Sequence, residues 1–420
     1  MKMVRSIRGF SQTRTVVSYA RARKPVSAQW PAKAVPERAT TKVYVGYMFA
    51  VTFLAVSTRP TYSADVLIIG TGLIGLACAN AAAARGLSVL LVGRSRPGAA
   101  SLAAAGLLAP SIEREDGHAG DFAMIARDRY PTYIDWLRDA TGIDVPLNRD
   151  GIVQVALNEA GVRGLRRSMS QHAEWLEQDA LVELEPALAH ALGGVLNPTD
   201  GCVDNVRLFE ALEIVVTRNA SIARADDTVI RIELTPSAVN VVGTSGTTFA
   251  AEKVVLAAGA WTATIAGLPR PIPVEPVRGQ MIAYSGSPLR RAVYGPTGYL
   301  VPRPTGRTLV GATTERVGFE SSTTPEGYER LRRTAAEVLP TLTGVQPIDS
   351  WAGLRPMSAD LQPILGSDPD EHRLIYATGH SRNGILMTPL TGDCVAALLV
   401  GEAPPANIEP FSIARFRSSS

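Results

Sequence analysis

The chain has 420 residues, of which 46% are hydrophobic and 19% charged, so it can bury a large core, and its length suggests two or three domains. This composition is unlike that of a disordered or fibrous protein. The net charge of +3 combines two unlike parts: residues 1–64 hold 11 basic residues and one acidic residue, and residues 65–420 hold 31 basic and 38 acidic residues. Since the body of the chain is mildly acidic, we expect no nucleic-acid partner.

The three cysteines indicate neither a disulfide framework nor a metal site. Cys78, Cys202 and Cys394 are far apart in the sequence and lie in unlike settings. Cys78 and Cys394 fall in small-residue and apolar helical patterns, so we expect both to pack in the core. No bound metal is predicted.

Residues 1–62 form an N-terminal extension that the predicted core does not need. Residues 1–42 are rich in Arg, Ser, Ala and Pro and show no sustained period, so we expect them to be disordered. The apolar run Val43–Val56 is too short to span a bilayer comfortably but suits a signal peptide. Three alternatives stay open: an export signal, an organelle transit sequence, or translated upstream sequence before a protein that begins near Val56. We favour the third and expect a cytoplasmic location; export or membrane association through the extension is the alternative, and membrane contact is expected only if residues 43–56 are retained.

Residues 65–93 predict a dinucleotide-binding unit. Val66–Ile69 is a short apolar run rich in β-branched residues, typical of a strand buried on both faces. Gly70, Gly72 and Gly75 follow with the GxGxxG spacing. The first glycine permits the tight turn, the second lets main chain approach a pyrophosphate, and the third lets the helix pack on the strand.

A helix and a second strand complete this unit. Leu73–Arg85 is small and apolar, Gly86 stands where a left-handed helix cap belongs, and Ser88–Val92 is a second buried strand. The N-terminus of such a helix offers unpaired N–H groups to phosphate. An acidic residue normally ends the second strand and binds the ribose hydroxyls, but this chain has Gly93 there, followed by Arg94.

Further elements follow along the chain. Ser101–Pro110 (SLAAAGLLAP) is either a plain alanine-rich helix or a stretch of small residues that lies against a flat cofactor ring. Apolar spacing predicts helices over Asp121–Ala140, Glu159–Gln178, Val206–Thr217, Pro325–Leu339 and Ile385–Val400. Strands are predicted over Gly151–Val155, within 228–250, and over Glu252–Gly259, Gly279–Tyr284, Gly298–Arg303, Thr308–Thr313 and Leu374–Ala377, with a turn over Gly201–Asn205.

Two of these strands are expected to complete the first sheet. Glu252–Gly259 (EKVVLAAG) has the apolar run of a buried strand and ends in glycine, so it belongs beside Val66–Ile69 in an open parallel sheet. The late strand Leu374–Ala377 runs into a glycine turn and a helix, and its return would make the first domain discontinuous in sequence. The alternating strands between Gly279 and Thr313 indicate an antiparallel sheet, and so a second domain of different architecture.

Seven motifs in order give the chain a family resemblance: IIGTGLIGL, AAAGLLAP, VVLAAGAWT, PVRGQM, GYLVPRPTGRTLVGAT, WAGLRPMSADLQPILG and GHSRNGILMTPLTGD. Together they cover residues 65 to about 400 and resemble the FAD-dependent amino-acid oxidase (DAO) family, most closely glycine oxidase of the thiamine-biosynthesis type. The resemblance implies an α/β fold, in which a discontinuous Rossmann-type FAD-binding domain carries a smaller α+β substrate domain built on an antiparallel sheet. We place the FAD-binding domain at 63–135, 198–262 and 348–405, and the substrate domain at 136–197 and 263–347.

The resemblance also implies an activity. Non-covalent FAD would oxidatively deaminate glycine or another small amino acid, such as sarcosine or a small D-amino acid, to the imine and oxo acid, and oxygen would reoxidise the flavin to form hydrogen peroxide. The protein would be a homo-oligomer, with a small amino acid and molecular oxygen as its partners. Two alternatives are a D-amino-acid dehydrogenase that passes electrons to a quinone, and a flavin-binding protein without catalysis, which the missing acid at Gly93 suggests.

Matching positions in the family motifs predict the site residues. Arg355 would clamp the substrate carboxylate bidentately, since a planar guanidinium suits a carboxylate best. Tyr299 matches a tyrosine whose hydroxyl supports that carboxylate, Arg382 would contact substrate or hold its loop, and Thr297 leaves the substrate preference open. No general base is predicted. We expect the flavin to be bound by Gly70, Gly72, Leu73, Ile74, Gly75, Arg94, Ser101, Ala104, Ala105, Gly106, Leu107, Val229, Ala258, Gly259, Trp261, His380, Arg382, Asn383, Gly384 and Ile385.

Overall fold

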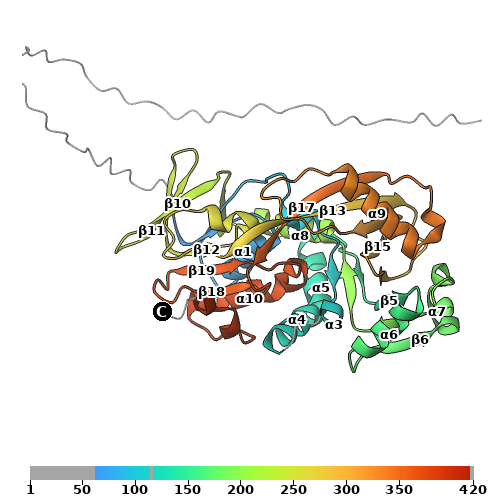
Figure 1. Ribbon diagram of the computed structural model, residues 1–420. Coiled ribbons are helices and arrows are strands. Elements are labelled where there is room, and N and C mark those ends of the chain that lie inside the picture. The colour runs from blue at the N-terminus through green and yellow to red at the C-terminus, as the bar shows by residue number, and fades with distance from the viewer. Residues whose placement is uncertain (1–61, 114–116, 417–420) are drawn as a thin grey trace, which may run out of the picture. The chain divides into compact units, whose positions relative to one another are not determined.

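The computed structural model of the protein describes residues 62–113 and 117–416 (Figure 1). The expectations for the N-terminal extension, including the apolar run 43–56, lie outside these residues. Within the described ranges, no helix is both long and apolar enough to cross a membrane.

The first sheet has a parallel centre. Its strands are β1 (Tyr62–Ile69), β2 (Val89–Val92), β9 (Ile222–Ala225), β12 (Thr248–Leu256), β19 (Leu374–Thr378), β18 (Ile364–Ser367), β10 (Val229–Leu234) and β11 (Val239–Gly243). β1 pairs in parallel with β2 and β12, and β12 pairs in parallel with β19. The predictions that the strand at 252–259 lies beside the first strand, and that the late strand returns to this sheet, are confirmed.

Alternating side chains of the first strand enter two different cores. Val66 and Ile68 face a cluster built with α1 (Leu73–Ala83) and α10 (Gly384–Val400). Leu67 and Ile69 face the opposite cluster, which includes side chains of β10, β11 and β12. Because both faces are covered here, residues 66–69 of the strand are all apolar and buried, as the sequence predicted. The arrangement is a Rossmann-type sheet with helices packed on it.

The second sheet is mainly antiparallel and has the strand order β17-β13-β16-β15-β14-β5-β7-β6. Its strands are β17 (Asp349–Ser358), β13 (Val274–Ser285), β16 (Arg307–Gly311), β15 (Tyr299–Arg303), β14 (Ala292–Tyr294), β5 (Ile152–Ala156), β7 (Gly193–Asn197) and β6 (Glu174–Glu177). Only the β14–β5 pairing among these is parallel. Helix α9 (Pro325–Val338) packs Leu331, Ala335 and Val338 into the core on one face. The expected antiparallel sheet is confirmed (Figure 1).

Strand β17 contacts parts of both sheets. It is hydrogen bonded along its length to β13 in the second sheet, although we placed residues 348–405 with the FAD-binding domain. Near its end, Met357 forms a bridge with His380, which directly follows the Gly379 turn after β19. The residue boundaries of the two domains stay a prediction.

Three local predictions were wrong. The helix expected over Glu159–Gln178 ends as α6 (Glu159–Ser168), because Glu174–Glu177 pairs as β6 with the edge of β7. The turn expected over Gly201–Asn205 is strand β8 (Gly201–Val203), which lies between β3 (Leu107–Leu108) and β4 (Leu147–Asn148). The single helix expected over Asp121–Ala140 is two helices, α4 (His118–Asp128) and α5 (Tyr130–Thr141), with Pro131 in the first turn of α5.

The other described α-helices are α2 (Ala100–Ala103), α3 (Pro110–Glu113), α7 (Gln178–Leu184) and α8 (Asn205–Arg218).

Candidate active site

A cavity of about 1970 Å³, including its mouth open to solvent, is lined by residues of both sheets. The carboxyl ends of β1, β2 and β19 border one part of it, and β13, β15 and β17 border the other. A ligand site outside the carboxyl ends of parallel strands is the rule for open α/β sheets. We call the part beside β1 and α1 the nucleotide end, and the part beside β15 and β17 the amino-acid end.

The glycine fingerprint shapes the nucleotide end. Gly70 has φ +119°, and a Cβ there would lie 2.3 Å from the Ala257 carbonyl oxygen. A Cβ on Gly75 would lie 1.8 Å from the Gly70 carbonyl oxygen, so the missing side chain lets α1 approach the turn. Gly75 therefore acts behind the cavity and does not line it. Gly72 is the N-cap of α1 and, as a glycine, has no side chain to cap this helix end.

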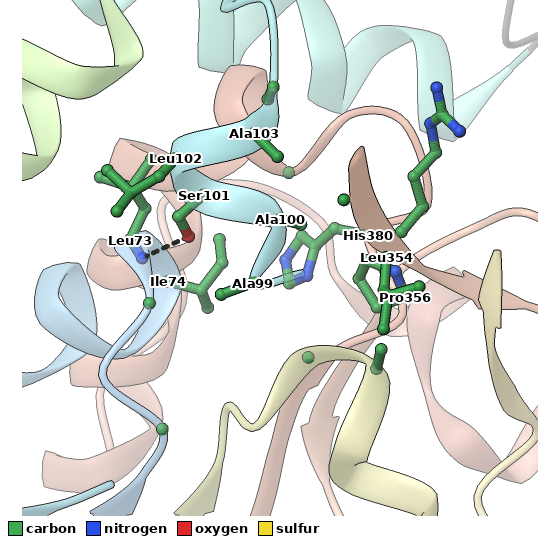
Figure 2. A pocket seen from close by; sticks show the side chains of 18 of the residues that line it. Leu73, Ile74, Ala99, Ala100, Ser101, Leu102, Ala103, Leu354, Pro356 and His380 are labelled. Atoms are coloured by element: carbon green, nitrogen blue, oxygen red, sulfur yellow. Dashed lines mark hydrogen bonds between the residues drawn. The ribbon is translucent and has the colours of Figure 1, made fainter. Parts of the chain in front are cut away.

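The stretch of small residues lies directly across from this helix end. Ser101 Oγ accepts a hydrogen bond of 3.0 Å from the Leu73 amide (Figure 2). The helix alternative holds only for Ala100–Ala103, because the chain leaves the helix at Ala104 and then lines the cavity through Leu107. This segment therefore offers small side chains and main chain to a flat ligand.

Two side chains that the sequence analysis did not select hold this segment in place. The buried Arg303 guanidinium donates to the carbonyl oxygens of Ala105 and Val203, both at 3.0 Å. Trp351 Nε1 donates to the Ala103 carbonyl oxygen at 3.0 Å. Both residues lie within the quoted motifs, Arg303 in GYLVPR and Trp351 in WAGLRP, and that was the signal that could have identified them.

Two arginines follow Gly93, the position where the usual acidic residue is missing. Arg94 follows Gly93, lines the cavity, and pairs with Asp226 at 3.0 Å on the surface. Arg96 also lines the cavity and lies over the Trp261 ring, 5.1 Å from its centroid. The N-terminus of α1 and the two arginines line the same cavity, which suits a pyrophosphate, so the residues present fit FAD even without an acid at the ribose.

The amino-acid end combines Arg355 with two tyrosines. Arg355 Nη1 donates to the Thr313 carbonyl oxygen at 3.1 Å, and its guanidinium occupies space over Gly279, where a Cβ would lie 2.3 Å from Nη1. The Tyr299 ring centroid lies 5.5 Å from that of Tyr294. Burial raises the pKa of Tyr299 and opposes the lowering effect of nearby Arg355, so the hydroxyl is a protonated donor at neutral pH.

Arg382 is bound to a carboxylate at the same end. Its Nη2 lies 2.6 Å from Glu113 Oε2, and both residues line the cavity. Glu113 and Tyr294 were not among the site residues predicted from the sequence. Glu113 stands in a run of charged residues that looks like ordinary surface, and Tyr294 lies in no quoted motif, so neither gave a usable signal.

His380 contributes a neutral buried side chain. Burial lowers its pKa to about 4, and its Nε2 lies 3.1 Å from Thr391 Oγ1. Figure 2 shows its ring in the cavity near Leu354 and Pro356. Ser381, the next residue, has a left-handed φ of +51°, a strained conformation for a residue other than glycine.

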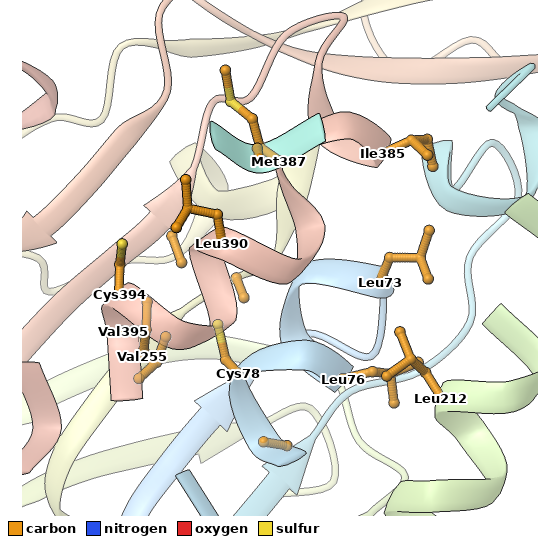
Figure 3. Packing of buried hydrophobic residues seen from close by; sticks show 14 of the residues in the cluster. Leu73, Leu76, Cys78, Leu212, Val255, Ile385, Met387, Leu390, Cys394 and Val395 are labelled. Carbon is orange, nitrogen blue, oxygen red and sulfur yellow. The ribbon is translucent and has the colours of Figure 1, made fainter. Parts of the chain in front are cut away.

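Helices α1 and α10 pack together behind the cavity (Figure 3). A Cβ on Gly392 would lie 3.0 Å from main-chain atoms of Ala77, which shows how closely the helices approach. Cys78 and Cys394 lie in this core and are free, as expected. Because residues at the N-termini of both helices line the cavity, this packing fixes two of its walls relative to one another.

The structure thus brings the expected residues together. All those predicted to bind flavin or substrate line this cavity except Gly75, while their individual roles stay predictions. Thr297 lies outside the cavity lining, because its hydroxyl bonds Glu337 and Thr334 on α9. It therefore gives no direct contact that could select a substrate.

The chain is similar to known flavin-dependent enzymes. The sequence profile of the family described as FAD dependent oxidoreductase (DAO) matches residues 65–398. Glycine oxidase of Geobacillus kaustophilus is 34% identical over 369 residues, which is 84% of this chain and 98% of that protein. The crystal structure of glycine oxidase from Geobacillus kaustophilus has a TM-score of 0.79 at 32% identity and covers 85% of this chain and 100% of that one.

A second group of relatives is longer. The bifunctional protein ThiO/ThiG of Synechocystis sp. is 35% identical over 369 residues, which is 85% of this chain and 55% of that protein. The chain therefore spans about half the length of the bifunctional relatives that it matches.

Proposed function

The chain belongs to the DAO family of FAD dependent oxidoreductases, as its motifs indicated, and we propose that it is an oxidase of glycine or another small amino acid. One observation carries the proposal most: Arg355 lines the same cavity as Gly70 and Ala105. A cation that can bind a carboxylate therefore shares one cavity with the GxGxxG turn. Had Arg355 lain outside this cavity, the proposed site would have had no clamp.

The substrate carboxylate would be held by Arg355. Its guanidinium is fixed by the bond to the Thr313 carbonyl and by the space that Gly279 leaves. A planar fork of donors binds both carboxylate oxygens and so fixes the orientation of Cα. The protonated Tyr299 hydroxyl would donate to the same carboxylate.

Positioning is the main contribution of these side chains to the reaction. Bound FAD would supply the redox chemistry, accepting a hydride equivalent from Cα and passing the electrons to oxygen as hydrogen peroxide. Holding Cα in a fixed orientation removes much of the entropic barrier. The protein need not supply a base if the substrate amine enters neutral, and His380, itself neutral, is assigned to the cofactor loop.

Similarity to glycine oxidase and to ThiO/ThiG supports glycine, sarcosine or small D-amino acids as substrates, and a role in thiamine biosynthesis. We further propose molecular oxygen as the electron acceptor, a homo-oligomeric assembly and a cytoplasmic location. The relatives do not favour the alternative of a quinone-linked dehydrogenase.

The test is a spectrum and a peroxide assay. The full chain is purified with FAD, its visible absorbance is recorded, and peroxide is measured with glycine, sarcosine and D-alanine. We expect a yellow protein that forms peroxide with at least one of the three. A colourless protein after addition of FAD would contradict flavin binding. A yellow protein that reduces a dye but forms no peroxide under air would favour the dehydrogenase.

A further inference from the structure

The charges at the amino-acid end suit a substrate with one carboxylate. Three described charged residues line this end: Arg355, Arg382 and Glu113. Their formal sum is one positive charge, which complements a single carboxylate. The other charged residues that line the cavity, Arg94, Arg96 and Asp227, adjoin β2 and β10 at the nucleotide end.

Hydrogen bonds of the neighbouring Ser111 hold Glu113 in this position. It ends α3, and the preceding Ser111 donates from both its amide and its hydroxyl to Asp200. Asp200 is fully buried and pairs with Arg127 at 3.4 Å. The segment that carries Glu113 is therefore anchored to a buried carboxylate.

The Glu113 side chain is only 14% exposed, whereas that of its partner Arg382 is 55% exposed. Glu113 lines the cavity together with Tyr294, Tyr299 and Arg355, and its charge adds to burial in raising the pKa of both tyrosines. The more exposed Arg382 is thus paired with the more buried Glu113.

We propose that Glu113 determines specificity by occupying Arg382, so that the site selects amino acids with one carboxylate and rejects N-substituted glycines with two. A second carboxylate needs its own cation, and among the described residues at this end Arg382 is the cation left besides the clamp. With Glu113 on it, a dicarboxylate would meet a like charge where it needs the opposite one. This inference rests on the proposed function and deepens it.

The change that tests this idea is Glu113→Gln. Glutamine has nearly the same shape but no charge, so the formal charge of this end rises from one positive to two. Arg382 then becomes available to a second carboxylate. The double variant Glu113→Gln with Arg382→Met removes that gain again if Arg382 is the group responsible.

Two matched pairs of ligands measure the change in preference between one and two carboxylates. Methoxyacetate and diglycolate have one and two carboxylates and no oxidisable amine, and their Kd values are measured by calorimetry on the flavin-loaded full chain. Sarcosine and iminodiacetate form the corresponding substrate pair, compared by kcat/KM. Glu402→Gln is the control, since it breaks a surface pair with Arg85 outside the cavity lining.

We expect Glu113→Gln to shift both preferences toward the dicarboxylate by about tenfold or more, as removing a like charge at contact distance should. Glu113→Asp, which keeps the charge, should stay within about threefold of wild type, well inside one tenfold step, as should Glu402→Gln. If Glu113→Gln does not fold, Glu113→Ser carries the test, because it also removes the negative charge that pairs with Arg382 and should shift the preference in the same direction.

The outcomes separate the two proposals. Peroxide formation by wild type with no shift in Glu113→Gln, or an equal shift in the double variant, overturns this inference alone. A shift in ligand binding without any amino-acid oxidation supports it and overturns the oxidase. Failure of wild type both to form peroxide and to bind either carboxylate ligand overturns both.

Discussion

At the nucleotide end of the cavity the closest packing involves glycines of one short stretch, Gly70–Gly75, whereas the amino-acid end is lined by charged side chains of separate segments. The first end depends on atoms that are missing, because added Cβ atoms would collide with carbonyl oxygens. The second depends on charges that meet only in the fold, such as Arg382 and Glu113. The difference implies that the first end is sensitive to size and the second to charge.

The largest effect is expected at the nucleotide end, from Gly75→Ala. Its Cβ would lie 1.8 Å from the Gly70 carbonyl oxygen, so α1 must move away from β1. We expect the free energy of unfolding to fall by about 3 kcal/mol and flavin to be lost. Urea unfolding and visible absorbance measure the two effects.

Gly86→Ala is the matched control at the other end of the same helix. Gly86 has φ +82°, but nothing lies within 4 Å of an added Cβ. Only the left-handed conformation then opposes alanine, at about 1 kcal/mol, and flavin should remain bound. Equal losses from both substitutions would show that close approach at Gly75 is not what shapes this end.

The next largest effect is expected at the amino-acid end, from Arg355→Ala. Loss of a bidentate charge-assisted contact should cost about 2.7 kcal/mol of substrate binding, which corresponds to roughly 100-fold in KM. The visible flavin spectrum should persist, because the nucleotide end is untouched. Steady-state peroxide kinetics provide the measurement.

Arg355→Lys sharpens this prediction. Lysine keeps the charge but loses the planar fork, so its KM should fall between those of wild type and Arg355→Ala. An unchanged KM in Arg355→Ala would remove this residue from the substrate site.

A smaller effect is expected where the two ends meet, at His380. Its pKa is about 4 in the folded protein, below the ordinary value of 6.5. Between these values the unfolded chain binds the proton and the folded protein does not, so this histidine lowers stability as pH falls through 6.5 toward 4. The expected loss between pH 7 and pH 5 is about 2 kcal/mol.

Urea unfolding across this range, compared between wild type and His380→Asn, isolates the contribution of this histidine from that of other titrating groups. The variant should lose less stability toward pH 5. The same slope in both proteins would show that His380 is not held neutral by burial.

The sequence by itself determined the features that depend on neighbouring residues. Local spacing and conformation predict the strand, glycine turn and helix at residues 66–85, and the second strand after them. The sequence also shows directly that Gly93 stands where an acidic residue is usual. The parallel partners of β1 could also be predicted, because only a strand covered on both faces is apolar throughout. Arg355 and Tyr299 were found through motifs rather than through any local physical signal.

Only the tertiary structure decided which distant groups meet. Glu174–Glu177 became a strand because the edge of β7 was available, against its helical pattern. Arg303 reaches the carbonyl of Ala105 nearly two hundred residues away, and Glu113 reaches Arg382 across a still longer separation. Hydrogen bonds and ion pairs between such residues leave no period in the sequence, since their geometry exists only after both sheets have packed.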